Sequence, residues 1–187
     1  MMVAMKPDPV TGKSDPEKMK AFKASHPDSV AQVDFLANNN PPVSFANSAY
    51  FGIHTFKLVN RAKKTTLVRW RFVPQDGELK SMPPNFLEQA LIERTKQGPL
   101  RWDMIIAIGE AGDSVDDPTL TWPANRKEIK VGRLTLSSTM PQKGAQCEKI
   151  NFDPLVISDG IEPTNDPILL FHSPAYAASF AKRMDGM

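Results

Sequence analysis

An alternation of apolar and charged positions, typical of β-strands, is the clearest pattern in the chain. Between residues 66 and 74, apolar side chains alternate with Arg69 and Arg71, as expected for a strand with one buried and one solvated face. The preceding run, residues 50–60, is rich in aromatic and β-branched side chains, and the short polar segment 61–65 connects the two runs. These runs therefore predict an antiparallel pair of strands.

Two further strands are predicted in the second half of the chain, at residues 102–108 and 129–137. The acidic, turn-prone stretch 113–118 separates them. Four strands leave two edges of a sheet unpaired, whereas closing a small barrel usually takes about eight. We therefore expect half of a barrel, with its edges covered by another chain or by a second copy of this one.

Capping residues and helical periodicity predict three helices before the last part of the chain. Residues 14–17 form a capping box of the Ser-x-x-Glu type and are followed by helix-forming residues. A second helix is predicted from Asp28 to the stop signal at 38–42, and a third between the prolines at 83–84 and Gly98-Pro99.

The last helix is predicted to begin at Ser173-Pro174, where a hydroxyl cap precedes a proline at the first helical position. It extends to about Arg183, so Tyr176 falls in its first turn. The proline-containing passage 141–167 before it is predicted to be extended and irregular.

At 187 residues, the chain has room for one ordinary domain with a sizeable core. We expect a single domain over residues 1–187, made of a helical arm (1–45), strands with one inserted helix (46–140), and an extended segment leading to the last helix (141–187). Hydrophobic residues make up 41% and charged residues 24%, close to the average for globular proteins, so the composition suggests neither disorder nor a membrane protein. The predicted fold class is α+β, an antiparallel half barrel flanked by helices.

Charge and apolar patterns exclude several functions. Lysine plus arginine exceeds aspartate plus glutamate by 23 − 21 = 2 and the basic residues are scattered, so nucleic acid is not an expected partner. No apolar run approaches the roughly 18 residues of a membrane span, and the start of the chain lacks a signal-peptide core. We expect no membrane association and a cytoplasmic location, with the periplasm as the alternative if a further segment precedes the chain.

Common catalytic and metal-binding spacings are not found. Cys147 is the only cysteine, so it forms neither an internal disulfide nor a Cys-x-x-Cys zinc or haem-attachment motif. The histidines, His26, His54 and His172, show no paired metal-ligand spacing. By itself, His54 in its apolar strand is typical of a buried core residue, and Asp116-Asp117 of an exposed turn.

Four stretches nevertheless form an ordered series. They are residues 50–60 with His54-Thr55-Phe56, residues 68–74, residues 121–123 with 129–136, and residues 151–154 with 160–163, Asp166-Pro167 and Tyr176. In this order they resemble the catalase superfamily, and in particular its small catalase-related haem peroxidases. The resemblance covers residues 7–183 and is to the C-terminal half of the family's domain.

The resemblance implies haem b as the cofactor, with the phenolate of Tyr176 as the ligand of the iron. In a first helical turn, unpaired backbone N–H groups and the helix dipole would favour negative charge on Tyr176. An anionic tyrosine donates electron density to the iron and so supports peroxide cleavage. Without the resemblance, Tyr176 would be interpreted as an aromatic packing residue.

A proximal network is implied around this tyrosine. The family has an arginine four residues before it, linked to the histidine of the His-Thr-Phe motif and to an aspartate ten residues before the tyrosine. The matching positions are His172, His54 and Asp166. The aspartate and the His-Thr-Phe histidine match, but His172 replaces the arginine, a titratable ring in place of a permanent cation.

Three more residues of the last helix are implied to contact the haem: Ser179, Phe180 and Arg183. Arg183 lies seven residues after Tyr176, where the family has an arginine that meets a haem propionate. The alternative interpretation of Arg183 is a solvated basic helix terminus.

The implied function is a peroxidase that acts on hydrogen peroxide or an organic peroxide with an electron donor. In the family a distal histidine moves a proton and an asparagine orients the substrate. Neither His26 nor His54 lies in a matching motif, so we expect the distal half to lie outside this chain. Two alternatives remain: a non-catalytic half barrel that pairs with another chain or itself, and a tyrosinate haem protein that rearranges lipid hydroperoxides.

Overall fold

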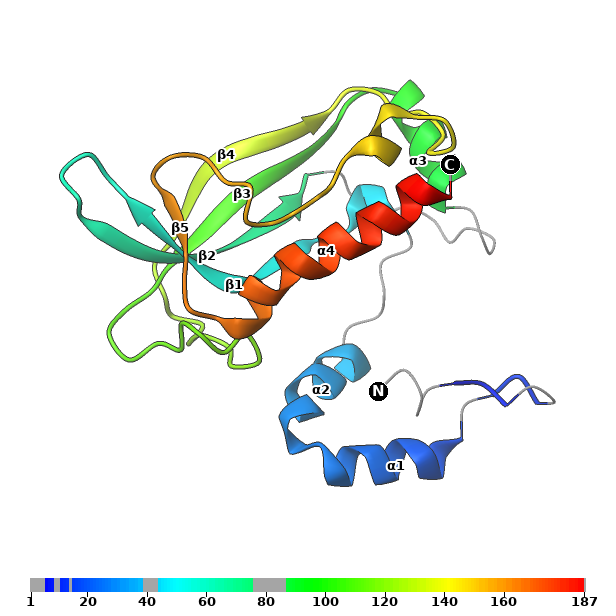
Figure 1. Cartoon of the computed structure of the whole chain (residues 1–187), viewed down its shortest axis with the longest axis horizontal. Helices are drawn as coiled ribbons and strands as arrows, with labels where there is room; N and C mark the ends of the chain where they lie inside the picture. The colour runs from blue at the N-terminus through cyan, green and yellow to red at the C-terminus, as the bar shows by residue number, and fades with distance from the viewer. Residues whose placement is uncertain (1–5, 9–10, 14, 39–43, 76–86, 187) are drawn as a thin grey trace. The chain divides into compact units, whose positions relative to one another are not determined.

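The computed structural model describes residues 6–8, 11–13, 15–38, 44–75 and 87–186. The chain forms two compact units, Met1–Pro41 and Pro42–Met187, which are coloured along the chain in Figure 1. The predicted division into one domain with three segments stays a prediction.

Helix α1, Pro16–Ser25, is the first helix of the N-terminal unit. Its N-cap is Asp15, whose carboxylate accepts a hydrogen bond from the Glu17 N–H at 2.9 Å. The predicted cap, Ser14, lies outside the described residues. The capping box therefore predicts the start of the helix correctly, and the Asp15 carboxylate makes the capping hydrogen bond.

Helix α2, Val30–Asn38, follows a single 3-10 turn, Pro27–Ser29. The predicted start at Asp28 falls in this turn, because the Ser29 N–H donates to the His26 carbonyl and tightens the chain before the α-helix begins. Both predicted helices of the arm are confirmed.

The second unit is built on one antiparallel sheet, as Figure 1 shows. Its spatial order is β4-β3-β2-β1-β5. The strands are β1 Tyr50–Val59, β2 Thr65–Pro74, β3 Leu100–Ile108, β4 Glu128–Leu136 and β5 Ile161–Pro163. The four predicted strands are confirmed, with bounds shifted by no more than two residues.

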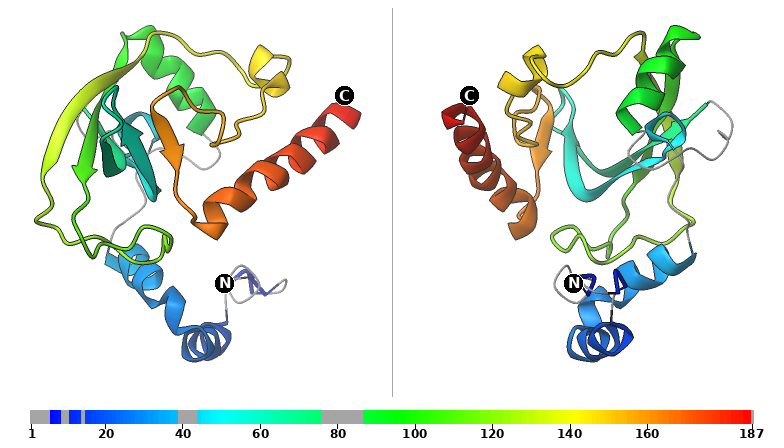
Figure 2. Two further views of the ribbon diagram at one scale, coloured as in Figure 1. Left: turned by 60° about the vertical axis from the view of Figure 1, so that its left-hand side comes forward. Right: turned by 90° about the vertical axis from the view of Figure 1, so that its right-hand side faces the viewer.

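The fifth strand, β5, was not predicted, since it lies in the passage expected to be irregular. It is three residues long and pairs with β1 through Phe56↔Pro163, Lys57↔Glu162 and Leu58↔Ile161. Three residues are too few to show an alternation, so this strand is defined only by the edge that it joins. Figure 2 shows β5 beside β1, at the other end of the sheet from β4, and α4 following β5.

The described residues of this unit form two α-helices, α3, Leu87–Lys96, and α4, Pro167–Asp185. The third predicted helix is confirmed from Leu87 onward, and its proposed starting prolines lie outside the described residues. None of the helices in the described part of the chain is both long and apolar enough to cross a membrane. The predicted α+β class with an antiparallel sheet is confirmed.

The predicted start of the last helix at Ser173 is wrong. Helix α4 begins at Pro167, because the Asp166 carboxylate accepts hydrogen bonds from the N–H groups of Ile168 and Leu169. Tyr176 is consequently the tenth residue of α4 and lies outside its first turn. The expected stabilisation of a phenolate by the helix N-terminus therefore does not apply, since that effect fades beyond the first turn.

The side chain of Leu169 joins α4 to the sheet. It is completely buried, and it belongs to a cluster with Phe56 of β1, Val68 of β2 and Ile106 of β3. A second cluster, of Ala46, Leu100 and Trp102, lies elsewhere in the core. Burying a leucine contributes about 1.5–3 kcal/mol, so the first cluster holds the beginning of α4 against three strands.

Among the residues that the structure describes, strand β4 is a free edge of the sheet, and it is exposed along almost its whole length. Ile129, Val131 and Leu134 are apolar, yet their exposed fractions are 38%, 50% and 48%, and the pairing with β3 skips Val131 at an irregularity. Such an edge presents unpaired backbone groups that another strand can join. The incomplete sheet expected from four strands is thus found at β4, whereas on the β1 side β5 pairs with Phe56, Lys57 and Leu58.

The long connection between β3 and β4 is held by a buried ion pair. The guanidinium of Arg126 donates two hydrogen bonds to Asp113, each of 2.8 Å, and the Asp113 side chain is only 2% exposed. The hydrogen bond from Arg126, followed by one from the Glu110 N–H, lowers the pKa of Asp113 to about 2. Because the pKa of Asp113 is lower in the folded state than its ordinary value, the ion pair stabilises the fold at pH values above that ordinary pKa.

We predict that Asp113→Asn removes part of the acid sensitivity of the sheet unit. The stabilisation from the charged Asp113 is complete above the unfolded pKa of about 4 and is lost as the pH falls toward 2. Urea midpoints measured between pH 5 and pH 2 should therefore decrease less steeply in the variant. Asp116→Asn, at an exposed position of the same loop, is the control, and equal slopes in all three proteins would contradict the prediction.

Candidate functional site

Three aromatic rings form a continuous series where β1 faces α4. The rings of His54 and His172 are 5.0 Å apart between centroids at an interplanar angle of 80°, and those of His172 and Tyr176 are 5.7 Å apart at 30°. His172 and Tyr176 are four residues apart on α4 and so lie on one helix face. The structure thus brings together three of the predicted site residues from two distant segments.

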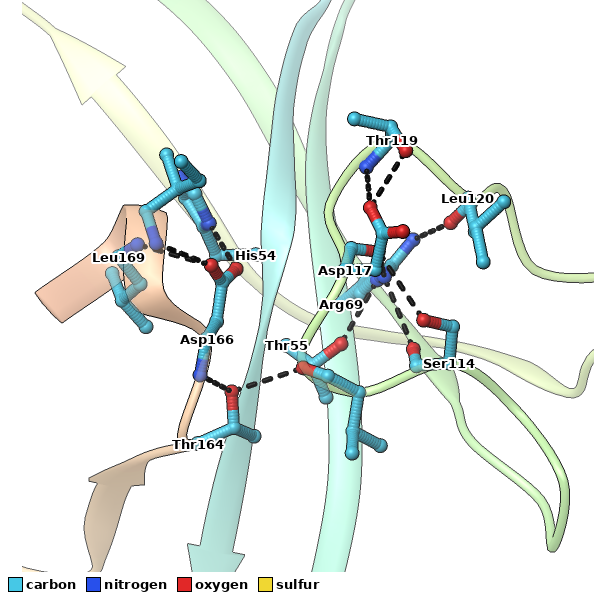
Figure 3. A network of polar contacts seen from close by, with 12 residues as sticks. His54, Thr55, Arg69, Ser114, Asp117, Thr119, Leu120, Thr164, Asp166 and Leu169 are labelled. Carbon is cyan, nitrogen blue, oxygen red and sulfur yellow. Dashed lines mark hydrogen bonds and ion pairs between the residues drawn. The ribbon is translucent and has the colours of Figure 1, made fainter. Parts of the chain in front are cut away.

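Asp166, the fourth predicted residue, holds His54 in place. The Nδ1–H of His54 donates a hydrogen bond to Oδ2 of Asp166 at 2.7 Å. The other oxygen of Asp166, Oδ1, accepts from Ile168 and Leu169 at 2.8 and 3.2 Å, as Figure 3 shows. The carboxylate is 1% exposed, so both oxygens of a buried charge are bound and the imidazole ring has one fixed orientation.

The geometry of β1 brings His54 to this position. Its pairing with β2 changes register between Gly52 and Phe56, a local irregularity that contains His54. A Cβ atom at Gly52 would lie 2.6 Å from Nε1 of Trp70, so a side chain there would displace the indole that packs against Phe56. Gly52 therefore leaves room for the Trp70 indole at the start of the irregular segment of β1 that contains His54.

His172 is half-buried between the other two rings. Its Nδ1 atom is buried and has no hydrogen-bond partner among the residues that the structure describes. An unsatisfied buried polar atom costs about 1–3 kcal/mol, so this nitrogen is open to a group that would complete its hydrogen bonding.

A second anchor of α4, which the sequence interpretation missed, lies next to His172. The Ser173 hydroxyl donates to Oδ2 of Asp153 at 2.5 Å, so it serves as a tether in place of the predicted cap. This hydrogen bond, and then one from the Leu155 N–H, lowers the pKa of Asp153. Asp153 lies in one of the stretches that carry the family resemblance, but no spacing rule links it to a hydroxyl twenty residues later.

The predicted haem-contact residues continue along α4 beyond Tyr176. Tyr176 is 40% exposed, Ser179 and Arg183 are exposed, and Phe180 is half-buried. The guanidinium carbon of Arg183 lies 5.5 Å from the centroid of the Phe180 ring, and Nη2 of Arg183 donates to the Ile150 carbonyl at 3.1 Å. Their roles as haem contacts stay predictions.

Comparisons with known proteins are consistent across sequence and structure. The family model described as "Catalase" matches residues 1–187. A catalase-related peroxidase of Synechococcus elongatus is 56% identical over 193 residues, which cover 100% of this chain and 57% of that protein. A catalase-related peroxidase of Mycolicibacterium paratuberculosis is 29% identical, over 98% of this chain and 59% of that protein. This chain therefore spans less than two thirds of the length of these relatives.

Solved structures agree on the fold. A fungal catalase matches 97% of this chain and 40% of its own chain with a TM-score of 0.81 at 22% identity. A bacterial catalase matches 97% of this chain and 39% of its own chain with a TM-score of 0.80 at 24% identity. The predicted catalase-type half barrel is confirmed as a fold.

We predict that Asp166→Ala lowers the free energy of unfolding of the sheet unit by about 2–4 kcal/mol, because it removes a helix cap and a charged hydrogen bond together. Urea denaturation followed by tryptophan fluorescence measures this, since all three tryptophans, Trp70, Trp102 and Trp122, lie in this unit. Asp117→Ala is the control, because Asp117 lies in the same unit and also accepts hydrogen bonds, from the N–H and the hydroxyl of Thr119, but is exposed. A loss below about 1 kcal/mol for Asp166→Ala would show that a simple cap explains it.

Proposed function

The chain belongs to the catalase family, and from that premise we propose that it forms the iron-binding, proximal part of a haem-dependent peroxidase that decomposes hydrogen peroxide or organic peroxides. The observation that supports the proposal most strongly is the continuous set Asp166, His54, His172 and Tyr176. These residues occupy the positions at which the family resemblance implies the tyrosine ligand and its supporting groups.

The residues present fit a haem group at this place. The Tyr176 ring is partly exposed, and the buried Nδ1 of His172 beside it lacks a partner in the described structure. Tyr176 would hold the iron through its phenolate oxygen, and Ser179, Phe180 and Arg183 would contact the rest of the group. When bound, haem b supplies the redox-active iron at which the peroxide bond is cleaved.

A chain of contacts among the protein's own residues orients the proposed iron ligand, Tyr176. Backbone amides of α4 and the Nδ1–H of His54 fix the carboxylate of Asp166, and this carboxylate in turn fixes the tautomer of His54. The edge-to-face contact with His54 places the His172 ring against Tyr176. A negative charge on the tyrosine would thus face an imidazole, in place of the permanent cation of the family pattern.

The remaining parts of the reaction are proposed to come from outside this chain. Peroxide cleavage needs a distal group that moves a proton between the two oxygens, and this chain spans 57% of a close relative. We place the distal histidine and asparagine in the rest of the protein, together with the strands that would cover β4. The proposed reaction also requires an electron donor. We propose a cytoplasmic location, because the free, exposed thiol of Cys147 suits a reducing compartment.

One observation favours a second candidate function. In the described part of the chain, no strand pairs with the outer edge of β4, which carries exposed apolar side chains. This suits a half barrel that pairs with another chain or with a second copy and carries out no chemistry. Self-association of the chain without haem binding would support this second candidate.

We predict that Tyr176→Phe abolishes the charge-transfer bands of ferric tyrosinate that appear when the purified chain is titrated with haem, because phenylalanine lacks the ligand oxygen. The chain has two tyrosines, so Tyr50→Phe is a matched control and should leave the bands unchanged. Visible absorption spectra of the titrations provide the measurement.

Each result of this titration has a defined meaning. Bands in the unaltered chain that disappear only in Tyr176→Phe support the assignment. Bands that persist in Tyr176→Phe would exclude Tyr176 as the ligand, and no bands in any of the proteins would favour the non-catalytic half barrel.

We predict that His172→Arg preserves the tyrosinate bands and increases peroxide turnover by about tenfold in protein that includes the distal half, since groups behind a metal ligand control activity by about 10–100-fold. Peroxide consumption, measured beside the spectra, tests this prediction. His26→Arg, which adds the same charge in the N-terminal unit, is the control. Turnover unchanged or reduced by His172→Arg would show that the imidazole is not a weaker substitute for the arginine.

A further inference from the structure

Arg69 of β2 connects two segments that lie on either side of its strand. Its Nε–H donates to Oγ1 of Thr55 on β1 at 3.0 Å, and its terminal nitrogens donate to the carbonyls of Leu120 and Ser114 at 2.7 and 3.2 Å. Its guanidinium carbon lies 4.9 Å from the centroid of the Trp122 ring. One half-buried side chain thus joins β1 to the loop between β3 and β4.

The same loop returns to the candidate site by a second route. The Thr164 hydroxyl donates to the Val115 carbonyl at 3.0 Å and accepts from the Asp166 N–H at 3.4 Å. Asp166 binds His54, which is the residue before Thr55. The contacts therefore close into a ring that runs from Arg69 through β1 to the site and back through the loop, as Figure 3 shows.

Burial makes this ring behave as a unit. Thr55, Thr164 and Asp166 are 0%, 3% and 1% exposed, so each needs its protein partner in place of water. Burial lowers the pKa of Arg69, and the carboxylates of Asp166, Asp113 and Asp117 partly oppose that effect. The guanidinium thus lies within the electrostatic influence of Asp166.

We infer that Arg69 is a positioning residue of the candidate site, which holds the irregular part of β1 and the N-terminus of α4 in one arrangement and thereby orients His54, Asp166 and Tyr176. The consequence for Tyr176 rests on the proposed function, whereas the positioning of the His54–Asp166 pair does not. Only an arginine fits this role, because its planar fork donates in several fixed directions at once and a lysine does not.

Amide hydrogen exchange tests the positioning without haem. The N–H groups of Ile168 and Leu169 are bonded to Asp166 and report on the N-terminus of α4. In Arg69→Gln and Thr55→Val, we expect these amides to exchange about tenfold faster relative to amides of β3, because the ring is opened while the core strands remain. Thr55→Val removes only the acceptor of Arg69 and keeps a β-branched residue in the strand.

Two further variants separate charge from geometry. Arg69→Lys keeps the positive charge, and we expect it to exchange nearly as fast as Arg69→Gln. Arg71→Gln is the matched control, because Arg71 is on the same strand, two residues away, and pairs with Glu128 at 2.6 Å. Exchange at Ile168 and Leu169 that is unchanged in Thr55→Val, or equally fast in Arg71→Gln, would overturn the inference, even if Arg69→Gln fails to fold.

Haem spectra test the consequence for the ligand. In the haem-loaded protein, Arg69→Gln and Thr55→Val should shift the tyrosinate bands, whereas Arg71→Gln should not, and unshifted bands in both former variants would overturn the orienting role. If the unaltered chain binds no haem, the proposed function fails, but the exchange measurement still decides whether Arg69 positions the pair.

Discussion

The buried carboxylate of Asp166 is the point on which both the last helix and the candidate site depend. One of its oxygens starts α4 by accepting two backbone N–H groups, and the other fixes the ring of His54. A buried carboxylate with unpaired oxygens would be strongly destabilising, so neither task is separable from the other. Asp166 lies between β5 and α4, and its hydrogen bonds to backbone N–H groups fix the start of the helix at Pro167. The same hydrogen bonds therefore determine where Tyr176 lies along α4.

The sheet supports this arrangement from both of its faces. On one face, Leu169 packs against three strands and holds the first turn of α4. On the other, Arg69 connects β1 to the β3–β4 loop, and that loop reaches Asp166 through Thr164. The end of the sheet near the site is therefore cross-linked by buried polar contacts, whereas β4, at the opposite edge, remains open.

The error in the start of α4 shows why local signals alone mislead. Both Asp166-Pro167 and Ser173-Pro174 have the form of a polar cap followed by proline. Only Asp166-Pro167 starts the helix. A start at this point lets the Asp166 carboxylate bind His54 and buries the Leu169 side chain in the core. Pro174 is tolerated inside the helix, where Ser173 binds Asp153 instead of capping.

From the sequence alone, the four long strands, the four α-helices of the described residues apart from the start of the last one, and a candidate group of His54, Asp166, His172 and Tyr176 could be predicted. Alternation, helical spacing and the ordered family motifs are local in the chain, so they need no tertiary information. The three-residue strand β5, the true start of α4 and the ring through Arg69 could not be predicted. Each of these is defined by partners tens of residues away, and only the packed sheet brings such partners within hydrogen-bonding distance.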